Sequence, residues 1–534
     1  GWIGTWRNHV GLSPEAWYEW AYLPFIGFVG GAIAGHVVQR FAPEARGSGI
    51  PYTQLALARP GTPLRRRAIW VKAVGASVGI GSGLSLGREG PTVQIGAGLG
   101  AWVSSWSKRS FIHRRQLIAS GAGAGIAAAF NAPIAGVLFV LEGMIKDFSS
   151  FTLGSAILAT VTAAVVARLL GGEAFIYPIA EAVFEGPELP LYLLIGLAAG
   201  MLGPLFVKGV LKALDFSDEQ AVRLPKAWHP AVVGFMTGCV GLFFPQVMGG
   251  SYSLVEGSLF ATIAFWTIPF ILISKMALTI LAYGSGAPGG IFAPSLVIGA
   301  LLGLAIGKLA VLVVPFLTLS PAGFAFAGMG AFFAAVSRTP VTAIVIVFEL
   351  TGNYTQILPL MLAVITASLV AERLHSPSIY SALLKRDGVE LEEGPEQLRL
   401  GAIPVRLAMT VNLETIPGSA PLSQVAETFA RSVHSGFPLV DDEGRLEGII
   451  TKADLRHALD EKLPLETLAR QIGGVPCRVI TPEHSLADAW RKLYRLGIGR
   501  LVVVDASDPT RLVGLLTRAD ILQTTGAFFD QPTG

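Results

Sequence analysis

The sequence predicts an all-α polytopic membrane domain made of two repeats with broken helices, followed by a smaller α/β module that occurs in tandem. Three observations predict this architecture: long apolar stretches that end near residue 385, an internal duplication within them, and a polar composition afterwards. Of the 534 residues, 52% are hydrophobic and only 14% are charged, whereas soluble chains carry about 25% charged residues. The composition therefore disfavours a soluble enzyme, and a net charge of +3 does not favour nucleic acid as a partner.

The membrane domain is expected over residues 1–385. Its apolar stretches are suited to a hydrocarbon layer of about 30 Å, and glycine or proline interrupts many of them. Inside a bilayer, an interrupted helix is tolerated only where its freed backbone lines a cavity or is buried in protein. The interruptions therefore point to a pathway through this domain.

The duplication within the membrane domain is visible as matched segments. GSGLSLGREGP at 81–91 aligns with GSGAPGGIFAP at 284–294 at a shift of 203 residues, and Glu142 meets Glu349 at a shift of 207. Transporters that are built from such repeats place the substrate site at the interface between them. We therefore expect a site where the two repeats meet.

The two repeats are assigned to about 1–180 and 189–385. The second repeat opens with an apolar segment at 189–214. Its equivalent in the first repeat would begin before residue 1, so we expect the N-terminus to be truncated.

The polar tail is expected to contain a linker at 386–399 and two similar modules at 400–460 and 465–534. GIITKAD at 448–454 repeats as GLLTRAD at 514–520. Each module reads as an apolar strand that ends in an acidic residue, then a turn, a second strand and a helix. This order predicts α/β modules in tandem.

Three short motifs in the membrane domain share one chemistry: GSGIP at 47–51, GREGP at 87–91 and GGIFAP at 289–294. In each, glycines precede a proline at the first turn of a helix, where the missing N–H group costs nothing. The free N–H groups and the positive dipole end of such a helix favour an anion. One such motif alone is equally well explained as a helix-packing site, but three in register with a repeat favour an anion pathway.

On these motifs, in this order and with the late Tyr380, the chain resembles the CLC family of chloride channels and chloride/proton antiporters. The tail resembles the paired cystathionine-β-synthase-type (CBS) modules that follow the membrane domain in many members. The resemblance implies a homodimer in the lipid bilayer, with a pore formed by inverted repeats in each subunit. It also implies a multi-pass protein of the cell (inner) membrane with a cytosolic tail, and a transporter instead of an enzyme.

The resemblance also implies roles for residues in the motifs. Glu89 would be the gate and the outer proton acceptor, because its carboxylate competes with chloride for the same N–H groups. Chloride would be bound by the hydroxyl groups of Ser48 and Tyr380 and by the backbone N–H groups of Ile291 and Phe292. Arg88, Gly90 and Lys72 would support the pore.

Each of these roles has a structural alternative. Ser48 could be a helix N-cap, which is compatible with chloride binding, and Glu89 could be a partner of the helix dipole. Arg88 and Lys72 could each pair with an acid or extend toward the interface.

Proton coupling depends on the segment that contains Glu142 and Gly143. Many antiporters of the family have a glutamate at the position of Gly143, and glycine cannot titrate. Glu142 adjoins it, but its repeat equivalent Glu349 favours a structural role at equivalent helix ends. We therefore expect chloride-selective transport with weak or absent proton coupling.

Two alternatives to this function remain open. One is a coupled chloride/proton antiporter, and the other, from a different class, is a CBS-regulated divalent-cation transporter. A cation site needs rings of carboxylate or carbonyl oxygens, whereas the three motifs present N–H groups. A membrane-anchored enzyme or nucleotide sensor finds no support in the spacing of nucleophiles, bases or metal ligands.

The tail contains a hydroxyl-x-x-Asp pattern in each module, formed by Thr451 with Asp454 and by Thr517 with Asp520. In CBS modules the aspartate can accept hydrogen bonds from ribose hydroxyls, so an adenine nucleotide is the expected regulatory ligand. The alternative is that both pairs are helix N-caps. No cofactor or metal is expected to be required, and Cys239 and Cys477 fit neither a disulfide framework nor a metal cluster.

Overall fold

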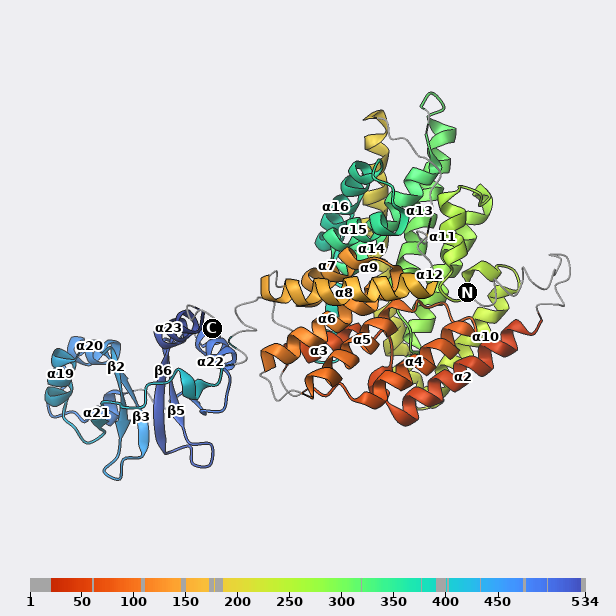
Figure 1. The fold of residues 1–534 in the computed structure, drawn as a ribbon. Helices are drawn as coiled ribbons and strands as arrows, with labels where there is room; N and C mark the ends of the chain where they lie inside the picture. Colours follow the sequence, from red (N-terminus) through yellow and green to blue (C-terminus); the bar gives the residue numbers. More distant parts are fainter. Residues whose placement is uncertain are drawn as a thin grey trace. The chain divides into compact units, whose positions relative to one another are not determined.

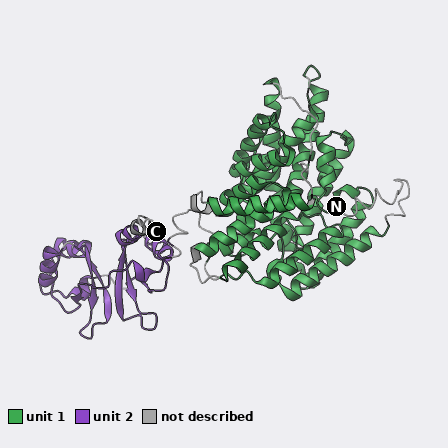
Figure 2. Ribbon diagram, viewed as in Figure 1, with its two compact units in different colours: residues 1–392 green, residues 393–534 purple. Residues whose placement is uncertain are grey.

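The computed structural model describes residues 21–59, 62–106, 111–145, 150–171, 177, 186–317, 319–375, 377–389, 400, 403–432, 434–473, 477–496 and 498–529. They form two compact units, Gly1–Glu392 and Glu393–Gly534 (Figure 2). Most of the predicted linker lies outside the described residues.

Unit 1 is helical (Figure 1). Its first half contains α2 (Leu23–Phe41), α3 (Ile50–Ala58), α4 (Arg66–Gly81), α5 (Glu89–Ser104), α6 (Phe111–Phe130), α7 (Pro133–Leu138), the π-helix η3 (Phe139–Ile145) and α8 (Ser150–Gly171). Its second half contains α9 (Leu189–Gln220), α10 (His229–Gly241), α11 (Tyr252–Leu259), α12 (Ile268–Gly284), α13 (Phe292–Val313), α14 (Pro321–Ser337), α15 (Pro340–Thr351), α16 (Ile357–Leu374) and α17 (Ile379–Arg386).

Several of these helices suit a bilayer by length and composition. In the part of the chain that the structure describes, five segments are long and apolar enough to cross it: Leu153–Leu170, Gly186–Gln220, Phe265–Gly284, Phe292–Val313 and Ile357–Arg386. Three other apolar segments, Pro133–Ile145, Pro321–Ser337 and Pro340–Thr351, are shorter than the roughly 20 residues that a spanning helix needs. These short helices each begin with proline and correspond to the predicted interruptions.

The duplication is repeated in the packing of the two halves. Helix α5 packs on α6 in the first half, and α13 packs on α14 in the second. A Cβ atom on Gly96 would overlap the carbonyl oxygen of Gly121, and one on Gly299 would overlap that of Gly328. Both helix pairs therefore depend on the absence of a side chain at equivalent positions.

The two halves run in opposite directions where they meet. Gly87 and Gly290, which are equivalent in the two repeats, form an antiparallel bridge in which each N–H group donates to the other's carbonyl oxygen at 2.7 Å. Reciprocal antiparallel pairing of equivalent residues requires a local two-fold relation between the segments. The inverted arrangement implied by the resemblance is thus present at this point.

Unit 2 consists of two modules, each with a three-stranded sheet (Figure 1). In the first, β1 (Ile416–Pro417) is parallel to β2 (Gly436–Val440), which is antiparallel to β3 (Leu446–Thr451); in the second, β4 (Val479–Ile480), β5 (Arg500–Val504) and β6 (Leu512–Thr517) repeat this order. The helices are α19 (Leu422–Arg431), α20 (Lys452–Asp460) and α21 (Ala469–Ile472), then α22 (Leu486–Arg495) and α23 (Arg518–Phe529). The predicted α/β modules in tandem are confirmed.

Candidate functional site

Three helix beginnings meet at one place in unit 1. Ser48 lies just before α3, Glu89 is the first residue of α5, and Ile291 lies at the N-terminal end of α13. A Cβ atom on Gly90 would lie only 2.8 Å from Cβ of Ser48 and 3.1 Å from Cα of Gly290. The three motifs are therefore in close contact, and glycine at position 90 is what allows this approach.

Glu89 lies at the centre of this meeting point. Its side chain is fully buried. Oε1 accepts a hydrogen bond of 2.7 Å from the hydroxyl group of Tyr252, and Oε2 accepts one of 3.4 Å from the backbone N–H of Ala293. Because Ala293 is in the first turn of α13, the carboxylate lies where unpaired N–H groups and the helix dipole attract negative charge.

Two cationic side chains beside the three motifs are held by neutral groups. Arg88 donates to the carbonyl oxygen of Ala129 at 3.0 Å, and its guanidinium lies 5.2 Å from the centre of the Tyr252 ring. Lys72 is fully buried and donates to the carbonyl oxygens of Ala45 at 2.9 Å and Gly47 at 2.5 Å. Lys72 therefore fixes the turn that precedes Ser48.

Lys275 is a functional candidate that the sequence interpretation missed. It is fully buried and donates to the carbonyl oxygens of Val247 and Gly249, at 3.2 and 2.9 Å, and to Oγ of Ser85 at 2.8 Å. Lys275 follows Lys72 by the repeat shift of 203 and binds the equivalent carbonyl oxygens. That shift was the signal that could have identified it.

The hydroxyl group of Ser48 has two neighbours. It lies 3.3 Å from the hydroxyl oxygen of Tyr283 and accepts a hydrogen bond of 3.3 Å from the backbone N–H of Ile50. The sequence predicts that Tyr380 binds the same chloride ion from the opposite side, and it gives no indication of Tyr283. Tyr380 is buried, and its ring centre lies 6.1 Å from that of Phe139.

Phe292 lies among other aromatic rings. Its ring centre is 5.1 Å from that of Phe130, 5.7 Å from that of Phe139 and 4.1 Å from that of Phe333. Ile291 is also buried. The wall beside the three motifs is therefore apolar, which makes each N–H or hydroxyl donor in it more effective because water does not compete.

A cavity of about 290 Å³ adjoins the Ser48 turn. Its lining includes Gly47, Gly49, Tyr283, Arg46 and Arg386. Arg386 also donates to the carboxylates of Asp215, at 2.7 Å, and Asp218. The cavity thus connects the turn with polar and charged groups at the end of α17.

Glu142 and Glu349 make reciprocal contacts with helix ends in the opposite repeat. The carboxylate of Glu142 accepts from the backbone N–H groups of Val341 at 3.1 Å and Thr342 at 2.7 Å, at the beginning of α15. The carboxylate of Glu349 accepts from Ile134 at 3.1 Å and Ala135 at 2.7 Å, at the beginning of α7. These contacts favour the structural interpretation of Glu142.

Gly143 has a crowded and partly polar environment. A Cβ atom on it would lie 3.0 Å from a methyl carbon of Thr339 and 3.3 Å from the ring of Phe139. The side-chain amide of Gln54 donates to the carbonyl oxygen of Gly143 at 2.7 Å. The side-chain oxygen of Gln54 is buried and has no hydrogen-bond donor among the described residues.

In each hydroxyl-x-x-Asp pair of unit 2, the threonine and the aspartate are hydrogen-bonded to each other. The backbone N–H of Thr451 donates to Oδ2 of Asp454 at 2.8 Å, and that of Thr517 donates to Oδ2 of Asp520 at 2.8 Å. In each pair the aspartate N–H donates back to the threonine oxygen, which is the reciprocal capping arrangement. Across the described ranges, no group of three or more His, Cys, Asp or Glu side chains is suited to a metal ion.

Residues 30–372 match the voltage gated chloride channel family, and residues 402–461 and 470–525 match the CBS domain. The chain belongs to the CLC family. The resemblance drawn from the three motifs is therefore confirmed, and this CLC chain is a multi-pass membrane transport protein and not an enzyme.

Relatives and solved structures agree with this assignment. The chain is 38% identical over 382 residues to the H(+)/Cl(-) exchange transporter ClcA of Salmonella paratyphi B. The aligned region covers 70% of this chain and 79% of the relative. A slow cyanobacterial Cl-/H+ antiporter has 35% identity and a TM-score of 0.65, covering 72% of this chain and 91% of its own. A eukaryotic CLC transporter has 22% identity and a TM-score of 0.63, covering 93% of this chain and 89% of its own. At this identity the likeness shows the fold alone.

Proposed function

We propose that this CLC chain is a coupled antiporter that exchanges chloride for protons across the membrane. The observation that carries the proposal is the buried carboxylate of Glu89 at the first turn of α13. It occurs in a chain with 38% identity to a transporter named for H(+)/Cl(-) exchange.

The expectation of weak or absent coupling is wrong. It is overturned by the relatives, because ClcA and the cyanobacterial structure, at 38% and 35% identity, are named as an exchanger and an antiporter of chloride and protons. The expectation rested on the absence of a titratable side chain at Gly143. A missing titratable group at one position does not close a proton route, since water and polar groups can also conduct a proton past it.

Glu89 would couple the two ions by competing with chloride. When it is ionised, its carboxylate occupies a position that suits an anion, near the backbone N–H of Ala293. When it is protonated, it loses its attraction to the helix end and leaves that position to chloride. The carboxylate and chloride therefore occupy the same position in turn, and each exchange of one for the other requires Glu89 to take up or release a proton.

The chloride site would be formed by neutral donors. We assign it to the hydroxyl groups of Ser48 and Tyr380 and the backbone N–H groups of Ile291 and Phe292, and we add Tyr283 because its hydroxyl oxygen lies 3.3 Å from that of Ser48. Arg88, Gly90 and Lys72 would support this site by charge and packing. Neutral donors bind an ion weakly enough to release it.

Protons would pass Gly143 with the help of water held by Gln54. The side-chain oxygen of Gln54 is buried without a donor among the described residues, and a buried acceptor of this kind is commonly satisfied by water. Glu142 is less suited to the task because both of its oxygens accept hydrogen bonds at the beginning of α15.

Flux in liposomes tests the coupling. The purified protein is reconstituted with high internal chloride, and valinomycin with equal potassium on both sides holds the membrane potential at zero. Chloride efflux should then drive protons inward, so the interior becomes more acidic than the bath. Chloride release with no proton movement would overturn the proposal.

Ser48→Pro is expected to shift anion preference from chloride toward nitrate. The substitution removes a hydroxyl donor and reshapes the turn before α3, and this donor together with the helix end suits a small halide. The ratio of nitrate to chloride flux in liposomes should rise severalfold. An unchanged ratio in a correctly folded variant would exclude Ser48 from the chloride site.

We propose that the CBS pair binds an adenine nucleotide through Asp454 and Asp520. Asp454→Ala should weaken binding by about tenfold, the loss expected for a hydrogen bond to a charged group, without altering the chloride-to-nitrate flux ratio. Calorimetry on the full-length protein with ATP, ADP and AMP measures this. No heat with any of them would leave the two pairs as helix caps.

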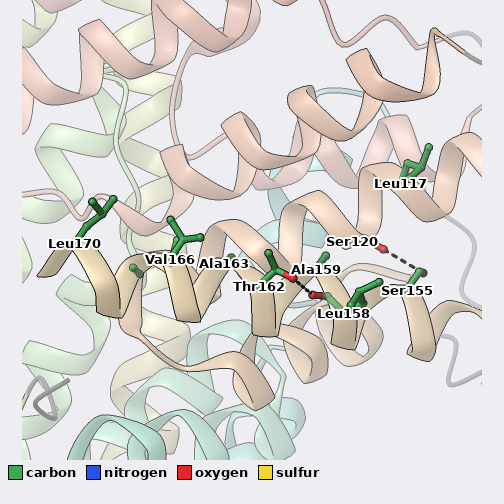
Figure 3. Close-up of a pocket in the computed structure, with 11 residues that line it drawn as sticks. Leu117, Ser120, Ser155, Leu158, Ala159, Thr162, Ala163, Val166 and Leu170 are labelled. Carbon is green, nitrogen blue, oxygen red and sulfur yellow. Dashed lines mark hydrogen bonds between the residues drawn. The ribbon is translucent and has the colours of Figure 1, made fainter. Parts of the chain in front are cut away.

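We further propose that two copies associate as a homodimer, through an apolar groove of about 820 Å³ between α6 and α8 (Figure 3). Small residues line much of it, namely Ser120, Ala128, Ser155, Ala159, Ala163 and Ala167. Within a membrane, small residues let a second helix approach closely. Two-step photobleaching of labelled protein in dilute liposomes is expected, and single steps throughout would reject the dimer.

A further inference from the structure

Tyr252 contacts the gate carboxylate, and the motifs did not reveal it. Its hydroxyl group donates to Oε1 of Glu89 at 2.7 Å, although the two residues are 163 positions apart. We infer that Tyr252 is a latch that holds Glu89 in the anion position and thereby sets the pH range in which this antiporter works. The inference rests on the proposed gate role of Glu89.

The ring of Tyr252 is held on two sides. The guanidinium of Arg88 lies 5.2 Å from its centre, and the ring of Tyr177 lies 6.5 Å away, tilted by 32°. A cation over an aromatic face is attracted to it. The hydroxyl group is therefore directed at Glu89 by its neighbours, so the hydrogen bond does not depend on a freely rotating side chain.

The backbone that carries Tyr252 is also fixed. Tyr252 begins α11, after Ser251 in the left-handed conformation (φ 57°). The turn before it is held by Lys275, whose ammonium group donates to the carbonyl oxygens of Val247 and Gly249. A buried cation with these acceptors makes the turn costly to deform.

The first repeat contains an equivalent turn that is held by an equivalent lysine, but this turn presents a different group. There, Lys72 holds the carbonyl oxygens of Ala45 and Gly47, and the turn presents Ser48 to the chloride site. At the shift of 202 that relates Gly47 to Gly249, Tyr252 corresponds to Ile50, which has no hydroxyl group. One fixed turn thus presents a donor for chloride, whereas the other presents a donor for the carboxylate that replaces chloride.

The latch acts on only one protonation state. An ionised carboxylate is a stronger acceptor for the Tyr252 hydroxyl than a protonated one, so the hydrogen bond favours the ionised, pathway-blocking gate. In the described part of the chain, the other titratable groups that interact electrostatically with Glu89 are Arg88, Tyr177, Lys275 and Tyr380. Of the described side chains, Tyr252 is the one that donates a hydrogen bond to this carboxylate.

Tyr252→Phe tests the latch because it removes only the hydroxyl group. Without the donor, Glu89 is easier to protonate, so protonation and transport should extend to higher external pH. The half-maximal pH for chloride flux should rise by about one unit, which corresponds to a tenfold change in the protonation equilibrium. Tyr192→Phe is the matched control, because Tyr192 is another buried tyrosine and its hydroxyl group donates to the carboxylate of Glu188 and to Gln356, at 3.4 and 3.2 Å.

The same substitution in a Glu89→Gln background separates the possible outcomes. If Tyr252 acts through the carboxylate, it should have no further effect there. The proposed role of Tyr252 is overturned if Tyr252→Phe leaves the pH profile unchanged. It is also overturned if Tyr252→Phe still shifts the profile when residue 89 is glutamine. If Glu89→Gln itself keeps the parent pH profile, the proposed gate has failed instead.

Discussion

Glu89→Gln is expected to leave chloride flux in place and to abolish its exchange for protons. Glutamine keeps the size of the side chain but cannot ionise, so it mimics the protonated gate at every pH. In the variant, no carboxylate competes with chloride near the N–H of Ala293, and no group at position 89 takes up or releases a proton. Proton movement driven by a chloride gradient should fall at least tenfold, and flux should lose most of its dependence on external pH.

Parallel recordings with a chloride electrode and an internal pH dye in the same liposomes measure both ions. Glu256→Gln is the matched control, because Glu256 is an exposed acid on α11, the helix that carries Tyr252. It should retain parent coupling. If Glu89→Gln still drives protons at the parent ratio, Glu89 is only a partner of the helix dipole.

Gly299→Ala is expected to destabilise the membrane domain strongly, although alanine is normally the better helix former by about 1 kcal/mol. A Cβ atom here would overlap the carbonyl oxygen of Gly328 and lie 2.9 Å from Cα of Met329. Both are backbone atoms of α14, so relief requires the two helices to separate. Overpacking of this kind costs about 1–3 kcal/mol or more.

The melting temperature and the monodisperse fraction in detergent measure this effect. Gly154→Ala is the control, because Gly154 lies within α8 and a Cβ atom there meets nothing within 4 Å. It should leave the melting temperature unchanged or raise it. Equal melting temperatures for the two variants would show that α13 and α14 can adjust to the added methyl group. Gly96→Ala should behave like Gly299→Ala, since Gly96 is its repeat equivalent.

The error over coupling has a local origin. Gly143 carries no titratable group, and this fact is readable from the chain. Whether a proton can pass depends on what surrounds that glycine, and Gln54, whose side chain donates to the carbonyl oxygen of Gly143, is 89 positions away in the sequence. A single position therefore says little about a path that many segments form together.

The sequence alone determined the membrane class, the duplication, the CBS pair and the position of Glu89, because each has a local signal. The length of the apolar stretches indicates a bilayer, and the matches at shifts of 203 and 207 residues indicate the repeats. Glycine before proline indicates the beginning of a helix. Only the tertiary structure decided that Tyr252 binds Glu89, that Tyr283 adjoins Ser48 and that Glu142 caps α15. These partners are between 163 and 235 positions apart, and a tyrosine or glutamate in an apolar stretch has no local pattern that names its partner. Packing brings them together, so their roles emerge from the folded chain.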